Sequence, residues 1–160
     1  MSAESQRPGA PNGGESPGAQ RPNARRRGEG HECPPPSAAG HLEPYGVRLR
    51  LQPQTHPLET ARFLTALLEE IAASCLEAGA SLIGHLKCVL HTVEGPLFCN
   101  LTSLRPGASC RGGGAKTIAP GAKAELDLAV LVYGLPAEVI ERVVGDVLEE
   151  LLLPLGVLLD

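Results

Sequence analysis

Aromatic side chains are scarce in this chain. Only 2% of its 160 residues are Phe, Tyr or Trp, and none is Trp. Hydrophobic residues make up 42% of the sequence, so any core must be built from aliphatic side chains. A chain of this length can bury one such core, and we expect one folded domain. The scarcity of aromatics also argues against nucleic-acid binding as a function, because single strands are held largely by stacking on aromatic rings.

Paired cysteines and long apolar runs are also missing. The five cysteines contain no CxxC pair and are odd in number, so they predict no simple disulfide framework. Cys75, Cys88 and Cys99 fall on predicted apolar faces, as buried thiols often do. A reducing compartment is the simplest interpretation. No apolar run could span a bilayer and no hydrophobic segment precedes the domain, so we expect a cytoplasmic protein without membrane insertion.

Signatures of catalysis and metal binding are absent from the sequence. It contains no Ser-centred elbow, no HExxH motif and no paired-carboxylate pattern. His85 and His91 lie six residues apart on one predicted strand, about 20 Å at the rise of a strand, which is too far for one metal ion. Cys110 beside Arg111 is interpreted as an incidental free thiol, since no base is near it in sequence. We therefore predict no catalytic residue, no metal and no cofactor, which favours a protein that is not an enzyme.

The first part of the chain, residues 1–44, is rich in Pro, Gly, Ser, Ala and charged residues and has almost no large apolar side chain. Such a segment cannot bury enough surface to offset the entropy lost on ordering. We expect a disordered tail over 1–44 and a single folded domain over 45–160. The cluster Arg25-Arg26-Arg27 could touch an acidic partner, but short basic clusters are common in solvated tails.

The clearest folding signal runs from Glu125 to Leu153. Its first part alternates apolar and other residues with the period of a strand that has one buried face. Gly134 then breaks the pattern, and Pro136 suits the start of a helix. Apolar residues next recur at helical spacing. The predicted strand buries Leu126, Leu128, Val130 and Val132, and the predicted helix buries Ile140, Val143, Val144, Val147, Leu148 and Leu151.

Upstream patterns predict the remaining elements. They are a strand over 47–51, a helix from Pro57 to Gly79, strands over 82–91 and 97–102, and a short edge strand over 156–160. The order is β-α-β-β-β-α with a possible final β. Because each element has one apolar face, we expect an α+β fold with two layers, in which two helices pack on one face of a mostly antiparallel sheet of four or five strands.

The segment 105–123 is rich in Gly and Pro and carries four cations and no acid. Its run from Gly107 to Thr117 resembles a phosphate-binding loop, with Arg111, Lys116 and Thr117 as the ligand-binding candidates. However, Ala115 separates the glycines from Lys116, and no helix follows to direct its N-terminus at an anion. A flexible loop between strands is the main interpretation. A ligand-binding or enzymatic domain that holds an anionic group here is the alternative.

The sheet face turned away from the helices is predicted to be half polar and half apolar, which suits an interface. Its candidate contact residues are His85, Lys87, Val89, His91 and Phe98. The first hypothesis is thus a non-catalytic interaction module that self-associates into a homo-oligomer or binds a protein partner through this face or through an edge strand. A loop 105–123 folded over Val89 and Phe98 would remove that surface. A weak nucleic-acid binder using Arg48, Arg50, the loop and the Arg25–Arg27 cluster is the third hypothesis.

Overall fold

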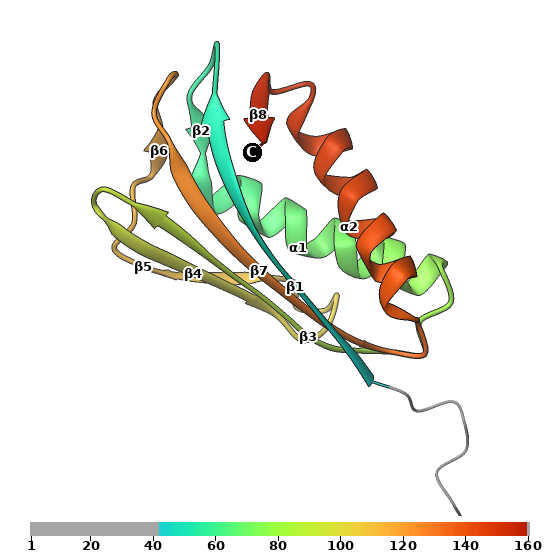
Figure 1. Cartoon of the computed structure of the whole chain (residues 1–160). Helices are drawn as coiled ribbons and strands as arrows, with labels where there is room; N and C mark the ends of the chain where they lie inside the picture. Colours follow the sequence, from blue (N-terminus) through green and yellow to red (C-terminus); the bar gives the residue numbers. More distant parts are fainter. Residues whose placement is uncertain (1–41, 160) are drawn as a thin grey trace, which may run out of the picture. The chain divides into compact units, whose positions relative to one another are not determined.

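A computed structural model describes residues 42–159 of the chain, and Figure 1 shows how their elements are arranged. These residues form an α+β fold with two helices and a six-stranded sheet, together with a small two-stranded sheet. The predicted fold class is confirmed. Residues 1–41 of the predicted tail lie outside the described residues, whereas Leu42–Pro44 belong to the first strand.

The strands of both sheets pair antiparallel. The large sheet has the order β5-β4-β3-β7-β1-β8, and the small one pairs β2 with β6. The strands are β1 (Leu42–Pro53), β2 (Leu58–Glu59), β3 (Leu82–Thr92), β4 (Gly95–Leu101), β5 (Ser109–Gly112), β6 (Thr117–Ile118), β7 (Ala124–Tyr133) and β8 (Val157–Leu159). The helices are α1 (Thr60–Glu77) and α2 (Ala137–Leu152). Both lie over the same face of the large sheet (Figure 1).

The predicted count of four or five strands was too low. β5 and β6 both lie inside the segment 105–123, which the sequence predicts as a loop. Residues Ser109–Gly112 lack an alternating apolar pattern, and they are a strand because β4 offers its backbone hydrogen-bonding groups beside them. The predicted short strand at the end of the chain is confirmed as β8, at the edge of the large sheet.

The core lies between the helices and the sheet. Along β7, buried residues alternate with half-exposed ones, as the period-2 pattern predicts. The buried stripe of α2 includes Ile140, Val144 and Leu148 and faces the sheet, as predicted. Leu151, the last residue of the predicted stripe, is only half-buried, while Leu152 beside it is 1% exposed. Helix α1 contributes Leu64, Leu67, Leu68, Ile71 and Cys75, which are fully buried.

Two glycines set the ends of the helix–strand connections. Gly79 follows α1 with a φ of 103°, a conformation that other residues rarely adopt, and its N–H donates to the carbonyl of Leu76. Gly134 has a φ of 88° and leads from β7 into α2. A Cβ added to Gly134 would lie 3.3 Å from the backbone nitrogen of Ser81. Gly134 therefore suits this turn in both conformation and size.

Candidate interaction surfaces

The large sheet has one face that no helix of residues 42–159 covers (Figure 1); we call it the outer face. One row of directly opposed residues crosses this face through five strands. In the order β5, β4, β3, β7 and β1 the row is Arg111, Phe98, Val89, Asp127 and Arg48. Phe98 is 47% exposed and Val89 is half-buried. The row thus places two apolar side chains between charged ones.

The charged residues on the β7 side of the row are tied together. The guanidinium of Arg48 donates to both carboxylate oxygens of Asp127, with 3.0 Å between Nη2 and Oδ2. His91 Nε2 lies 3.0 Å from the same Oδ2. The hydrogen bond from Arg48, followed by that from His91, lowers the pKa of Asp127 to about 2. Asp127 is therefore ionised at neutral pH.

The predicted interface residues are only partly brought together. Lys87, Val89 and Phe98 line one shallow depression of about 290 Å³ on the outer face, which Arg111 also lines. His91 lies in the next row, opposite Glu125. His85 lies further along β3, opposite Leu131, and is half-buried. Its Nε2 is buried without a hydrogen-bond partner among the residues that the structure describes.

The predicted anion-binding residues are divided between two sheets. Arg111 is in β5 on the outer face, while Thr117 is in β6 and lies opposite the acidic Glu59. The carbonyl of Lys116 accepts hydrogen bonds from both the N–H and the hydroxyl of Thr60, each at 3.0 Å. The segment therefore supplies a partner for the first N–H of α1, where a helix otherwise attracts anions.

The segment 105–123 leaves Val89 and Phe98 uncovered. β5 extends the sheet beside β4, so this part of the segment lies in the sheet and not on top of it. The N–H of Ala108 donates to Glu69 Oε1 of α1 at 3.0 Å, which directs the segment towards the helix layer. The hypothesis that the loop covers the outer face does not match this arrangement.

The cysteines differ from the sequence-based interpretation. Cys110 is not a free thiol: it lies opposite Cys99 and forms a disulfide with it. The prediction missed this pair because it missed β5, which brings the two residues together. Cys75 and Cys88 are free and buried, and burial raises the pKa of their thiols to about 11 and about 12. No His, Cys, Asp or Glu cluster in residues 42–159 could hold a metal ion.

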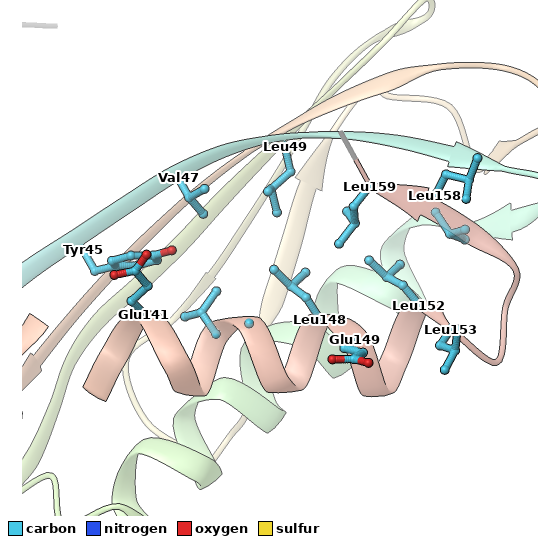
Figure 2. Close-up of a pocket in the computed structure, with 13 residues that line it drawn as sticks. Tyr45, Val47, Leu49, Glu141, Leu148, Glu149, Leu152, Leu153, Leu158 and Leu159 are labelled. Carbon is cyan, nitrogen blue, oxygen red and sulfur yellow. The ribbon is translucent and has the colours of Figure 1, made fainter. Parts of the chain in front are cut away.

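A second surface, which the sequence analysis did not predict, lies between β1 and α2. It is an apolar groove of about 540 Å³, and Figure 2 shows the side chains that line it. Tyr45, Val47 and Leu49 of β1 point towards α2 in this view. The residues of α2, of β8 and of the connection between them that complete the lining are Glu141, Val144, Gly145, Leu148, Glu149, Leu152, Leu153, Val157, Leu158 and Leu159. We call this surface the β1–α2 groove.

Exposed leucines continue the apolar surface at one end of the β1–α2 groove. Leu153 is 74% exposed and Leu158 is 56% exposed. The pKa of Tyr45 is raised by partial burial and then by the carboxylate of Glu141. The only sequence signal for the groove is the apolar–polar alternation of β1, which continues upstream of the predicted strand 47–51 to Tyr45. The groove itself depends on where β8 pairs along β1, which a local pattern does not predict.

Comparison with known proteins gives no further guidance. No family model, curated protein or solved structure matched this chain. Among the described residues, no helix is long and apolar enough to cross a membrane.

Proposed function

We propose that this chain is a non-catalytic interaction module that self-associates or binds a protein partner through the outer face of its large sheet. The observation that supports this function best is the exposed apolar pair Phe98 and Val89, which lie opposite each other with charged residues on both sides. A sheet face that only meets water usually alternates cleanly between apolar inside and polar outside. Apolar side chains within a polar surround are instead typical of non-obligate interfaces.

Self-association is the first form of the proposal, because the outer face carries both signs of charge. Lys87 and Arg111 lie towards the β5 edge, while Glu125 and Asp127 lie on β7. A two-fold axis near Val89 would bury Val89 and Phe98 of one copy against the same apolar patch of the other, with charges of both signs around it. Two-fold interfaces need such a self-complementary patch. A protein partner with the same mixed character is the second form.

The other sequence-based hypotheses have less support. Arg111 and Thr117 belong to different sheets, so they offer no common cradle for an anion. The weak nucleic-acid hypothesis relies on Arg48 and Arg50, but few aromatic side chains are present to stack on bases. A cytoplasmic location also remains a prediction. The disulfide between Cys99 and Cys110 counts against its premise of a reducing compartment, where disulfides are rare.

Photo-crosslinking from the outer face tests the position of the interface. A benzophenone amino acid in place of Phe98 should crosslink to the outer face of a second copy or to one partner protein. Mass spectrometry of the product should then identify the linked peptides. The matched control places the same group at Val93, which is fully exposed in the β3–β4 turn. Equal yields from the two positions, or products that map to the helix layer, would contradict the proposed face.

A further inference from the structure

The edge of the large sheet beside the β1–α2 groove is open along most of β1. β8 pairs only with Leu51–Pro53, at one end of that strand. Within residues 42–159, no strand lies beside Gly46, Arg48 or Arg50 on the side opposite to β7. The sixth strand of the sheet, β8, therefore covers only one end of β1. Within the described residues, the rest of that edge of β1 has no neighbouring strand.

The hydrogen bonds show which backbone groups this edge presents. The N–H of Gln54 donates to Gly156 on the β8 side at 2.9 Å, and the carbonyl of Pro53 accepts from Gly121 at 2.7 Å. Backbone groups of successive strand residues point to opposite sides. Even-numbered residues of β1 therefore direct their N–H and C=O groups to the open edge. Pro44, which has no N–H, falls in this set, as is usual for a proline in an edge strand.

Gly145 leaves open space on the side of α2 that lines the β1–α2 groove. Gly145 lies in the interior of α2, where glycine destabilises a helix relative to alanine. A Cβ added there would have nothing within 4 Å, so the packing of the described residues does not require a glycine. Gly145 lines the β1–α2 groove. Its small size leaves room for a group that enters the groove between α2 and the open edge.

The charges on the two sides of the open edge differ in sign. Arg48 and Arg50 project on the outer face, with side chains that are 67% and 64% exposed. On the helix side, Glu141 and Glu149 line the groove. Each arginine pairs with one carboxylate of β7 and still exposes most of its side chain on the side away from β7. A strand placed beside β1 would therefore favour acidic side chains on the outer face and apolar ones towards α2. β7 on the other side of β1 has this pattern, with Asp127 opposite Arg48 and Glu125 opposite Arg50.

We infer that the open edge of β1 and the β1–α2 groove together bind an extended segment of another protein, which adds as a strand in line with β8. The segment carries apolar side chains at alternate positions, which enter the groove, and acidic side chains between them, which face Arg48 and Arg50. Backbone hydrogen bonds to Gly46, Arg48 and Arg50 hold it, as in other cases of strand addition. This site is distinct from the outer-face association proposed above and does not depend on it.

A second copy of this chain fits the edge less well. Antiparallel pairing of two β1 edges would bring two copies of α2 side by side. Glu141 and Glu149 lie four residues on either side of Gly145, so in antiparallel helices that cross there each would face the other's carboxylate. The segment 1–41 also lacks the alternating apolar side chains that such a strand needs. It has almost no large apolar residue, and it contains the run Pro34-Pro35-Pro36, which does not suit a paired strand.

Amide exchange followed by NMR tests this inference with a peptide probe. The probe has the sequence of Ala124–Leu131, which is the pattern that already pairs with β1. We expect it to slow the exchange of the Gly46, Arg48 and Arg50 amides and to leave Tyr45, Val47 and Leu49 unchanged, because their amides already bind β7. A control peptide with Lys at both acidic positions should bind about tenfold more weakly, since it places like charges opposite Arg48 and Arg50.

Two matched variants show whether the groove takes part. Gly145→Leu should fold, because its Cβ meets nothing, and should abolish the protection by filling the groove. Gly113→Leu has equally open space around its Cβ, lies outside the groove and should behave as the unmodified chain does. Val89→Glu on the outer face should leave peptide binding intact, which separates this inference from the proposed function.

Three results would overturn the inference. One is peptide binding that leaves the Gly46, Arg48 and Arg50 amides unprotected. Another is protection that persists in Gly145→Leu. The third is protection of the same amides in the free chain that rises with protein concentration, because a second copy would then occupy the edge.

Discussion

Arg48 and Asp127 lie directly opposite each other on β1 and β7, and the arginine side chain donates to both oxygens of the carboxylate. His91 on β3 reaches the same carboxylate from the other side. This group links three adjacent strands of the outer face: β3, β7 and β1. Its residues are exposed, so its importance lies more in the charge pattern of the face than in stability.

Acid should weaken the fold through Asp127. Its folded pKa of about 2 lies below the ordinary value of 3.8, so its ion pair contributes fully above about pH 4 and is lost as the pH falls towards about 2. Chemical denaturation of the native chain at about pH 5 and about pH 2 should show a decrease in stability that is smaller in Asp127→Asn. Equal pH dependence in the two proteins would contradict the assigned hydrogen bonds.

The helix α2 should tolerate charge on one side only. Val144 is 1% exposed, so Val144→Asp buries a charge and should cost about 3 kcal/mol or more, enough to unfold a marginal domain. Arg142→Asp on the exposed side of the same helix is the control and should change the midpoint little. Thermal unfolding followed by circular dichroism measures both. A cooperatively folded Val144→Asp protein would show that this stripe is not the core.

The four cysteines of the described domain should separate into two classes. Peptide mapping without reductant should find Cys99 linked to Cys110. Cys75 and Cys88 should resist iodoacetamide until the chain unfolds, because burial both blocks access and raises the pKa of each thiol. Leu76→Cys, at a position that is 40% exposed, should react in the native state. Rapid labelling of Cys88 in the folded chain would be inconsistent with the structure.

Nucleotides should not bind the segment 105–123. Arg111 and Thr117 lie in different sheets, and the carbonyl of Lys116 already accepts from the first N–H of α1. Isothermal calorimetry with ATP should therefore show no heat of binding. Heat that weakens with salt and disappears when both Arg111 and Lys116 are replaced by Ala would restore the anion-binding alternative.

The sequence predicted those parts of the fold in which local pattern and burial agree. β7 and α2 follow this rule, because Leu126 to Val132 alternate and Ile140 to Leu148 keep helical spacing. β5 was missed because Arg111 and its neighbours are held by β4 and not by an apolar face of their own. The start of β1 was missed because Pro44 and Gly46 are poor strand residues, and their place is set by pairing with β7.

The candidate surfaces also differ in how much of each could be predicted from the sequence. The outer-face positions Lys87, Val89 and Phe98 were predicted as one group, since strand parity alone places them on one face. The position of Arg111 beside Phe98 required knowledge of β5. The β1–α2 groove required the pairing of β8 with one end of β1, which is a tertiary property and has no local sequence signal.

Sedimentation velocity of the unmodified chain and of Val89→Glu over a wide concentration range tests the outer-face proposal most directly. Val89 lies away from the helices, so its replacement should leave the far-UV circular dichroism unchanged. In the self-association form, the unmodified chain should form a concentration-dependent oligomer, and Val89→Glu should remain a monomer. The control Val93→Glu, in the fully exposed turn, should assemble normally. A monomer at every concentration, or an oligomer that Val89→Glu leaves intact, would contradict self-association through this face.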